Sequence, residues 1–580
     1  MNNASASVLP GTQERSRSSL TAQLLLRVLE LHPLLDVYHG LAKARDPVDF
    51  ARQALAALDI SVERRGKPLA SLPAQGPLFL AANHPFGGVE GLVLAAWCAA
   101  QRPDLKILVN HMLCRIPELR PIFIPVDVFK AGNSQNIAGL RAALTHMEQG
   151  GALAVFPSGA VSHWHAGQRR VTDPEWNPLI GRLARIGGAS VVPLYFEGRN
   201  SLLFQAAGLA HPLLRTVLLP HELWRMRGHE VRLHIGERVE PELLAELRDD
   251  KARTAYIRAR CYALGRSDVR NKAKRQTAVA TGPLREALLD EIHSLPRERI
   301  LVEEGKYSAL FVSGAQSPHI LREIGCLREK TFRMVEEGSG KPLDLDRFDP
   351  YYTHLVLWDG QAQAIAGGYR MRQVFPTTSR RVLKTLYTAS LFRFEEEFFE
   401  RCGISMELGR AFVAPPYQRE YAPLLMLWKG IGRLAAMAGT RTLFGPSSIG
   451  LGYAPESVVM LRQYLKECCG IPELASLVRG RRGPRPFSGP NAPDARGLEY
   501  RVLDRAVRGL EGDKGVPILF KHYLQLGGRI AAFHEDRKFG TLDALMVVDL
   551  TRAPEKLLLR YMGEERLRTL RLAHNTAPRS

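Results

Sequence analysis

Short runs of apolar and β-branched residues recur between residues 76 and 239, and stretches with helical periodicity separate them. The runs are GPLFLAANHP, LKILVN, PIFIPVDV, GALAVFP, ASVVPLYFEG and VRLHIGERV, and one of the helical stretches covers residues 138–149. Strand candidates that alternate with helices in this way predict an α/β domain with a mixed sheet. The order of the elements therefore sets the fold class of this part of the chain.

The length of the chain requires more than one core. It has 580 residues, and a single hydrophobic core stops growing at about 250–300 residues. Residues 266–282 are basic and small and lose the apolar periodicity, which predicts a linker. We therefore expect a disordered polar leader over residues 1–20, a first domain over 21–265 and a second domain over 283–580.

Helices and strands also alternate in the second half, which predicts a second α/β domain. Helices are expected over residues 283–294, 318–336 and 422–438, and strands over 300–303, 308–312, 404–413 and 441–449. Asp359 and Gly360 mark the turn of a hairpin. Residues 478–497 are too rich in Pro, Gly and Arg for a core. Near the start of the chain, leucines at helical spacing predict an amphipathic helix over residues 20–44, interrupted near Pro33.

The chain is strongly basic, with 79 Lys and Arg against 59 Asp and Glu and a formal net charge of +20. Such a charge favours a polyanionic partner, and an anionic membrane surface, a nucleic acid and an acidic carrier protein all qualify. The seven cysteines include no CxxC pair, which is typical of a reducing compartment. The longest apolar run, residues 91–100, falls short of the roughly 20 residues of a transmembrane helix. We expect a soluble or peripherally bound cytoplasmic protein.

Residues 83–90 combine a histidine, two adjacent glycines and a carboxylate just after a predicted strand. An imidazole can accept a proton from an attacking hydroxyl when a carboxylate holds its other ring nitrogen. His84 and Glu90 are therefore candidates for a catalytic dyad, although a lone histidine followed by an acid is more often structural. His163 and His165 also alternate on a predicted strand, but no third ligand stands at a recognisable spacing, so no metal site is predicted.

The segments PIFIPVD, VFPSGAVS and VVPLYFEG follow this histidine in order. Together with NHPFGGVE they resemble the blocks of the glycerolipid acyltransferase family, of the lysophosphatidate acyltransferase type, over residues 60–240. The resemblance implies that the first domain is an O-acyltransferase in which His84 is the general base on the acceptor hydroxyl and Glu90 orients it. Substrate contacts are expected at Phe156, Pro157, Ser158 and Gly159. Arg115 is a further candidate, either as a contact for an anionic substrate group or as an ordinary surface arginine.

The sequence departs from the pattern of this family at several positions. Five residues rather than four separate His84 from the acid, and the acid is Glu rather than Asp. Residues 122–127 and 156–161 lack the arginines that the corresponding blocks of the family carry. Arginine is the natural bidentate ligand for phosphate, so these departures argue against a glycerol-phosphate acceptor.

A second ordered set of residues lies in the second half. Its members are Arg328, Phe332, Asp346, Asp349, Arg370, Glu407 and Arg410. The set resembles the acyl-homoserine-lactone synthases and, more closely, the ornithine acyl-ACP N-acyltransferases, both branches of the GNAT superfamily, over residues 307–450. The resemblance implies that Glu407 is the base, acting through a water, and that the three arginines shape the carrier and carboxylate side of the site. The two aspartates would hold a cationic acceptor or brace the arginines, and each of these charges can also belong to a structural ion pair.

Ordinary GNAT proteins bind the coenzyme A pyrophosphate on a glycine-containing turn at a helix N-terminus. The corresponding stretch here, Gln418–Pro423, contains no glycine, and Pro423 has no backbone N–H. This difference disfavours coenzyme A and favours an acyl carrier protein as the acyl donor, with no cofactor.

Taken together, the two halves resemble the bifunctional ornithine lipid synthases. The resemblance implies that the C-terminal domain transfers a 3-hydroxyacyl group from acyl-ACP to the α-amine of ornithine, and that the N-terminal domain acylates the 3-hydroxyl of the lyso-ornithine lipid. The implied partners are an acyl carrier protein, an anionic membrane surface and these two substrates, without nucleic acid. The implied location is peripheral, on the cytoplasmic face of the inner membrane.

Three alternatives stay open. The chain can be a phospholipid-remodelling lysophospholipid acyltransferase with an accessory GNAT-like domain, or the synthase of another N-acyl amino acid such as glycine or lysine. It can also be a basic protein that binds membranes or nucleic acids on an inactive acyltransferase scaffold. The intact pairs His84/Glu90 and Glu407/Arg410 argue against the non-enzymatic alternative.

Overall fold

The computed structural model describes residues 31–574 except 42, 127–133, 267–276 and 513. The leader expected over residues 1–20 and most of the linker expected over 266–282 lie outside the described residues. The described part of the helix expected over residues 20–44 is α2 (Leu31–Gly40), and Pro33 lies close to its first described residue. Residues 20–30 lie outside the described residues, so the interruption expected near Pro33 stays a prediction.

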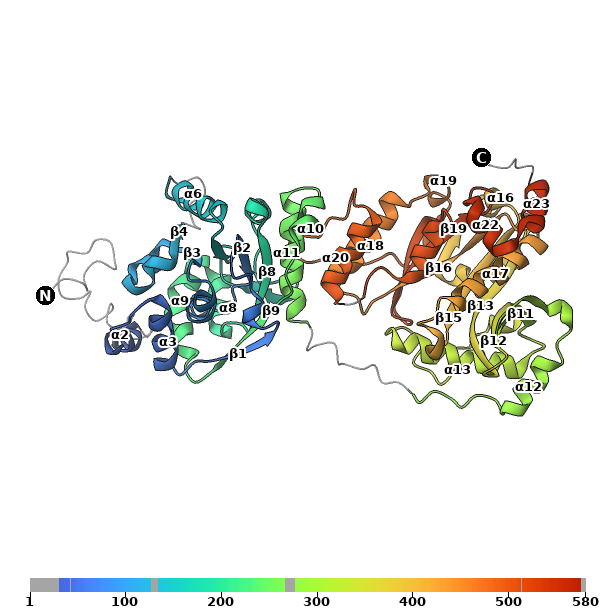
Figure 1. Cartoon of the computed structure of the whole chain (residues 1–580), viewed down its shortest axis with the longest axis horizontal. Coiled ribbons are helices and arrows are strands. Elements are labelled where there is room, and N and C mark those ends of the chain that lie inside the picture. The colour runs from blue at the N-terminus through green and yellow to red at the C-terminus, as the bar shows by residue number, and fades with distance from the viewer. Residues whose placement is uncertain (1–30, 42, 127–133, 267–276, 513, 575–580) are drawn as a thin grey trace. The chain divides into compact units, whose positions relative to one another are not determined.

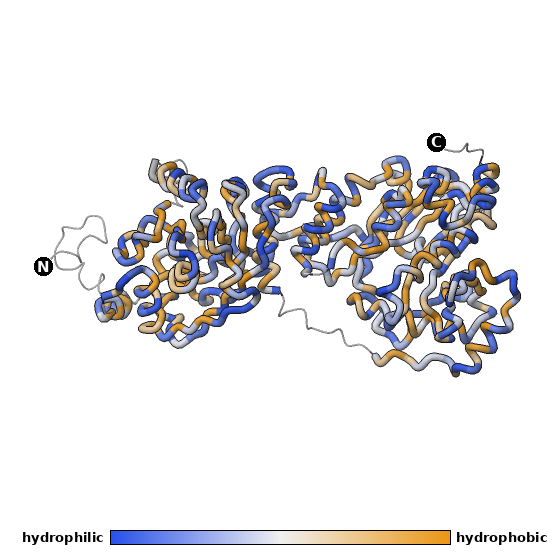
Figure 2. Tube along the Cα trace, viewed as in Figure 1, coloured by the Kyte–Doolittle hydropathy of each residue, from blue (hydrophilic) through white to orange (hydrophobic). Residues whose placement is uncertain are grey.

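The chain forms two compact units, residues 1–269 with 488–494 and residues 270–487 with 495–580 (Figure 1). Both units mix helices and sheets, so the predicted α/β fold class is confirmed. Apolar segments run through both units (Figure 2), and each unit has its own cluster of buried side chains. No helix among the described residues is long and apolar enough to cross a membrane.

Unit 1 is built on a seven-stranded mixed sheet. Its strands, in spatial order, are β1 (Ser61–Gly66), β9 (Glu230–Ile235), β8 (Ser190–Glu197), β2 (Leu78–Ala82), β5 (Ala152–Val155), β3 (Lys106–Asn110) and β4 (Phe123–Val126). Only β8 and β9 pair antiparallel. All six strands predicted from the sequence are present. The seventh, β1, was missed because its sequence SVERRG is charged and partly exposed at the edge of the sheet.

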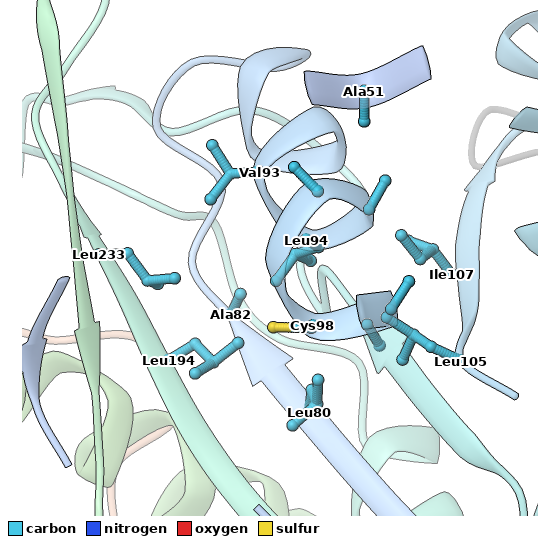
Figure 3. Packing of buried hydrophobic residues seen from close by; sticks show 14 of the residues in the cluster. Ala51, Leu80, Ala82, Val93, Leu94, Cys98, Leu105, Ile107, Leu194 and Leu233 are labelled. Atoms are coloured by element: carbon cyan, nitrogen blue, oxygen red, sulfur yellow. The ribbon is translucent and has the colours of Figure 1, made fainter. Parts of the chain in front are cut away.

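Helices cover the sheet of unit 1 and a small hairpin extends from it. The helices are α3 (Pro47–Ala57), α4 (Val89–Val93), which continues as a helix to Gln101, α6 (Ser134–Glu148), α7 (Leu179–Leu183), α8 (Leu202–Ala210), α9 (Pro212–Arg225), α10 (Pro241–Glu246) and α11 (Asp250–Leu264). The hairpin consists of β6 (His163–His165) and β7 (Arg170–Thr172). Leu80 and Ala82 of β2 pack under Val93, Leu94 and Cys98 of the helix that follows (Figure 3). Each such leucine contributes about 2–3 kcal/mol by leaving water, which holds the loop between β2 and α4 in place.

Unit 2 is built on an eight-stranded sheet. Its strands, in spatial order, are β10 (Ile300–Glu304), β11 (Tyr307–Ser313), β12 (Thr353–Asp359), β13 (Ala364–Val374), β15 (Ser405–Val413), β16 (Thr442–Gly450), β19 (Thr541–Asp549) and β18 (Arg529–Asp536). The parallel pair β15–β16 interrupts an otherwise antiparallel sheet, and it pairs only residues 405–407 with 442–444. A second small sheet joins β14 (Phe392–Phe394) to β17 (Val478–Gly480).

Helices cover both faces of this sheet. They are α12 (Arg285–His293), α13 (Pro318–Met334), α14 (Arg380–Leu383), α15 (Thr388–Leu391), α16 (Glu396–Cys402), α17 (Ala422–Met437), α18 (Pro455–Cys468), α19 (Pro472–Ala475), α20 (Tyr500–Glu511), α21 (Ile518–Gln525), α22 (Glu555–Met562) and α23 (Glu564–Ala573). Val356 of β12 belongs to the cluster with α12 and α13, whereas its neighbour Leu355 meets Gly430 of α17. Successive strand residues point to opposite faces, so α13 and α17 lie on opposite sides of the sheet.

Residues 478–497 were expected to lie outside any core, but some of their side chains are buried. Val478 and Asn491 are buried, and residues 488–494 group with unit 1. The amide of Asn491 accepts from the N–H of Trp176 (2.7 Å) and donates to its carbonyl (3.0 Å). This prediction was therefore wrong at these positions, because a polar side chain that pairs with backbone groups can be buried at little cost.

Candidate active sites

His84 lies just beyond β2, a central strand of the unit 1 sheet that pairs parallel with β5 and β8. The preceding residue, Asn83, fixes this strand end. Its side-chain amide donates to the carbonyl of Phe196 (2.9 Å) and accepts from the N–H of the same residue (2.7 Å). The histidine is thus held at the carboxyl end of parallel strands, where α/β proteins bind their ligands.

Glu90 stands in the first turn of α4, whose N-cap is Gly88. Its Oε1 atom accepts the backbone N–H groups of Phe86 (2.6 Å) and Gly87 (3.2 Å) and lies 3.3 Å from Nδ1 of His84. The same carboxylate oxygen therefore closes the loop and faces the imidazole. The additional residue between His84 and Glu90 is accommodated by this loop, in which Gly87 has a φ of +94°.

The two members of the pair are buried to different extents, since the side chain of Glu90 is fully buried and that of His84 is 17% exposed. Burial disfavours a charge on the imidazole, but the charges of Glu90 and Asp173 outweigh it, and the pKa of His84 lies above its usual range. Burial also acts to raise the pKa of Glu90, yet the imidazole and the Phe86 N–H hold that pKa below its usual range. Both directions are those of a carboxylate that stabilises a protonated imidazole.

Asp173 is a further member of this group that sequence reasoning missed. Its Oδ1 atom accepts the backbone N–H of His84 (3.2 Å) and the hydroxyl of Ser162, and its Oδ2 atom accepts the indole N–H of Trp176 (2.9 Å). It is fully buried and lies 89 positions after His84 in the chain. No motif spacing connects the two residues, so the sequence carried no signal for this contact.

Phe156 stacks on the ring of His84, with the ring centroids 4.3 Å apart and an angle of 25° between the planes. Ser158 and Gly159 form the turn that follows, and Pro157 is buried. Of the four residues predicted here as substrate contacts, Phe156 is the one that touches the His84–Glu90 pair.

The sequence also singles out Arg115, His163 and His165. Arg115 is exposed at the end of the 3₁₀ helix His111–Arg115, and no contact among the described residues joins it to His84. The rings of His163 and His165 stack 4.4 Å apart, and burial lowers the pKa of both. The part of the chain that the structure describes contains no group of three His, Cys, Asp or Glu side chains placed to hold a metal ion.

A buried ion network in unit 2 joins α13 and β13 to the residues before β12. Arg328 of α13 and Arg370 of β13 both donate to Oδ1 of Asp349, at 2.8 and 3.1 Å. All three residues are at most 1% exposed. Burial acts to raise the pKa of Asp349, but the two guanidinium groups hold it far below its usual range. In this geometry Asp349 braces the arginines, which is one of the two roles that the sequence leaves open.

Asp346 and Arg410 extend the network. Arg370 donates to Oδ1 of Asp346 (2.7 Å), and Arg410 lies 3.6 Å from Oδ2 of Asp346 and 3.1 Å from Oδ2 of Asp344. The side chain of Asp346 is 25% exposed, so the network reaches solvent there. Nε and Nη2 of Arg370 have no hydrogen-bond partner among the residues that the structure describes. A buried guanidinium with two unused donors is suited to an anionic ligand group such as a carboxylate.

Glu407 lies on β15 at the last residue that pairs with β16. Its Oε1 atom accepts the N–H of Thr388 (2.6 Å), and its Oε2 atom accepts the hydroxyl of Tyr352. The Tyr352 oxygen accepts the N–H of Tyr387 (2.7 Å), and the Tyr387 hydroxyl accepts from Arg410 (3.0 Å). Tyr352 and Tyr387 therefore connect Glu407 to the ion network, although the backbone N–H and the hydroxyl of Tyr387 make separate hydrogen bonds.

Arg410 reaches the network from an irregular stretch of backbone. Its φ is +51°, and the register between β13 and β15 shifts beside it. Such a φ is uncommon for a residue other than glycine and persists where the surroundings fix it, often at functional sites. Its guanidinium lies 4.7 Å from the ring centres of Tyr387 and Phe539, and Phe332 meets Phe539 edge-on at 5.5 Å. Phe332 thus supports Arg410 from the apolar core, through Phe539.

Sequence reasoning missed four polar side chains of this second site, namely Asp344, Tyr352, His354 and Tyr387. Nδ1 of His354 lies 3.2 Å from Nη2 of Arg328. Burial and the nearby Arg328 lower the pKa of His354 to about 4, so the ring is a neutral acceptor. None of the four stands at a spacing that a sequence pattern would single out.

Family models match parts of both units. An acyltransferase model matches residues 45–269, and an acetyltransferase (GNAT) domain model matches residues 327–429. The two sites and these matches define an α/β acyltransferase that carries a GNAT domain, and both resemblances expected from the sequence are confirmed.

Three curated relatives share parts of the chain. The lyso-glycine lipid O-acyltransferase of Phocaeicola vulgatus is 31% identical over 210 residues, which are 35% of this chain and 73% of that protein. The glycine N(alpha)-acyltransferase of the same organism is 34% identical over 169 residues, 27% of this chain and 51% of that protein. The L-ornithine N(alpha)-acyltransferase of Rhodobacter capsulatus is 28% identical over 228 residues, 37% of this chain and 77% of that protein. The chain belongs to the acyltransferase family, and it spans about half the length of the glycine N(alpha)-acyltransferase that it matches.

Proposed function

We propose that the chain makes an amino-acid lipid by two successive acyl transfers and that ornithine is the first acceptor. In unit 2 the α-amine of ornithine attacks the thioester of a 3-hydroxyacyl carrier protein, a C–N bond forms, the C–S bond breaks and the carrier thiol leaves. In unit 1 the 3-hydroxyl of the lyso-lipid attacks a second acyl thioester, and an ester forms. The observation that carries the proposal is that one chain holds two separate candidate sites for a proton acceptor, at His84 and at Glu407.

His84 is the general base of the second transfer. Its Nδ1 faces Glu90, so Nε2 is the ring nitrogen left to accept the proton of the attacking hydroxyl. The carboxylates of Glu90 and Asp173 raise the pKa of His84 and so stabilise the imidazolium that forms. The proton then passes to the departing thiolate, and the neutral imidazole is restored.

Glu407 accepts the proton of the first transfer through a water, and the arginines bind anionic groups. The two unused donors of Arg370 are matched to the α-carboxylate of an amino acid. The start of α17 supports an acyl carrier protein as the donor. Pro423 stands in the first turn of this helix, and residues 418–422 contain no glycine, so the turn that binds the pyrophosphate of coenzyme A in other GNAT proteins is not formed by the expected residues. The net charge of +20 suits an acidic carrier and an anionic bilayer, which supports a peripheral location on the cytoplasmic face of the inner membrane.

The preference for ornithine over glycine is supported by two acids near Arg410, the half-buried Glu337 and the buried Asp543. Glu337 accepts from the hydroxyl of Ser448 (3.2 Å), and Ser448 is paired with Asp543 across β16 and β19, so all three side chains lie close together. Burial raises the pKa of both carboxyl groups to about 7, and Arg410 lowers each only in part. Two acids that lack a sufficient cation are suited to the side-chain ammonium of ornithine, a group that glycine does not have.

The affinity for ornithine is expected to increase with pH between 6 and 8. Both acids are largely protonated below their pKa of about 7, and a bound ammonium favours the ionised form, so the KM for ornithine should fall as the pH rises through 7. Asp543→Asn should raise the KM about 10- to 100-fold, as expected for a lost charged hydrogen bond of about 1.5–3 kcal/mol, and should flatten the pH profile. Asp359→Asn, which removes a buried carboxylate at the β12–β13 turn, is the control. An unchanged KM in Asp543→Asn would refute this role.

The proposal as a whole is tested in a bacterial host that makes no aminolipids. The full chain is expressed with labelled ornithine in one culture and labelled glycine in another, and the lipids are analysed for label, phosphate and acyl chains. We expect a phosphate-free lipid with two acyl chains that is labelled only from ornithine. Label only from glycine would keep the two-step synthesis and overturn the acceptor. New acyl chains on phospholipids without either label would overturn the amino-acid lipid and favour a remodelling acyltransferase.

A further inference from the structure

The two helices α8 and α9 expose a group of large apolar side chains. Phe204, Gln205 and Gly208 face the interior of unit 1, whereas the opposite face is open to solvent. Helices α8 and α9 pack against each other (Figure 1), and we call their exposed apolar residues the leucine face. It consists of Leu202 (81% exposed), Leu203 (58%), Leu209 (67%), Leu213 (58%), Leu214 (42%) and Val217 (44%). Single exposed leucines are ordinary, but six large exposed apolar side chains on two helices that pack together indicate an interaction site.

Positive charges accompany the leucine face without exposed negative ones. Residues 199–229 contain Arg199, Arg215, Arg225 and Arg227, and their one acidic residue is Glu222. Glu222 is buried, and its carboxylate accepts the N–H and the hydroxyl of Ser201 at the start of α8. Arg225 pairs with Glu222 (3.3 Å), whereas Arg199 and Arg227 are exposed and Arg215 is half-buried. Exposed leucines with flanking arginines are the composition of a surface that enters the headgroup region of an anionic bilayer.

The leucine face is connected directly to the loop that carries His84. Asn200, just before α8, donates to the carbonyl of Phe86 (3.2 Å). A Cβ atom on Gly87 would lie 2.5 Å from Cδ2 of Leu219, so α9 packs against the backbone of the loop itself. Residues just before α8 and in α9 therefore contact the loop of Phe86 and Gly87 directly. A lipid that enters along α8 and α9 therefore arrives beside the imidazole.

We propose that the leucine face is the membrane-docking surface of unit 1, through which an anionic bilayer delivers the lyso-lipid acceptor to His84. The proposal rests on the proposed function, since it requires a lipid acceptor. A second copy of the chain is the other occupant that an apolar face allows, but the absence of an exposed carboxylate among residues 199–229 disfavours pairing of this basic surface with itself. The bilayer supplies the complementary charge as well as the apolar phase.

The test compares vesicle binding of the full chain and two triple variants. Vesicles of phosphatidylglycerol with phosphatidylethanolamine, or of phosphatidylcholine alone, are floated with wild type, with Leu202→Gln/Leu209→Gln/Leu213→Gln, and with Leu284→Gln/Leu559→Gln/Leu572→Gln as a matched control on exposed leucines of unit 2. We expect wild type and control to bind the anionic vesicles, and the leucine-face variant to bind at least tenfold more weakly. Its activity on a short-chain acceptor dissolved in water should remain, while activity on vesicle-borne lyso-lipid falls.

Each other outcome overturns the docking surface. Equal flotation of both variants and wild type places membrane binding elsewhere, and equal loss in both variants shows that leucines in general are responsible. A wild type that does not float refutes docking even if the labelled lipid appears in cells, which separates this failure from that of the proposed function. If wild type sediments as a dimer and the leucine-face variant as a monomer, the face is an interface between copies.

Discussion

His84→Ala is expected to stop the second acylation and leave the first intact, so that labelled mono-acyl ornithine accumulates. A general base contributes about 10²–10⁴-fold to proton removal, and the rate of ester formation should fall by that factor. Ion-exchange or thin-layer separation of lipids from labelled cells measures the ratio of mono-acyl to di-acyl product. In wild type, ester formation should increase as the pH rises through the pKa of His84, which Glu90 and Asp173 hold above its usual range despite burial, because only the neutral ring accepts a proton.

The control for this result is Phe156→Leu, which removes the ring stacked on His84 but leaves the imidazole and Glu90 in place. It should lower the rate of ester formation much less than His84→Ala does. Wild-type amounts of di-acyl product in His84→Ala would contradict the role of His84 as base. Loss of both products, together with loss of the folded protein, would show that the substitution acts on stability.

Glu407→Gln is expected to abolish labelled lipid altogether, because the first transfer supplies the acceptor of the second. Its carboxylate accepts from the Thr388 N–H and the Tyr352 hydroxyl, and an amide cannot accept a proton from the attacking amine. The rate of N-acylation should fall by about 10²–10⁴-fold. The measurement is single-turnover transfer from an acyl carrier protein to labelled ornithine by the purified chain.

The variant Tyr352→Phe tests whether Glu407 takes part in catalysis or only stabilises the structure around it. It removes one hydrogen bond to Glu407 and leaves the carboxylate able to accept a proton, so most of the N-acylation rate should remain. If Glu407 only anchors Tyr352 and Thr388, the two variants should lose similar activity and similar stability in thermal unfolding. That result would remove Glu407 from the chemistry.

All strands of the unit 1 sheet except β1, all strands of the unit 2 sheet except β18 and β19, and the pair His84 and Glu90 could be predicted from the sequence, because their signals are local. The strand β2 reads as an apolar run that is buried on both faces, and His84 and Glu90 stand within one loop and helix turn. Edge strand β1 has no such run. The contacts of Asp173 with His84 and of Tyr352 with Glu407 join residues 89 and 55 positions apart, and only the folded sheet brings them together. Side chains that act through long-range hydrogen bonds leave no periodic pattern.

The ion network of Arg328, Asp349 and Arg370 also affects whether a chain with an incompletely folded second unit can form a product. These charges come from α13, β13 and the residues between, and a buried charge that loses its partner costs about 3–5 kcal/mol. The candidate site of unit 2 is therefore expected to lose stability as a whole when one of these elements is out of place. On the proposed function its product is a single-chain amphiphile, which behaves as a detergent. Coupling the site to complete folding makes the network a quality control, since a damaged second unit would make no detergent rather than make it without restraint.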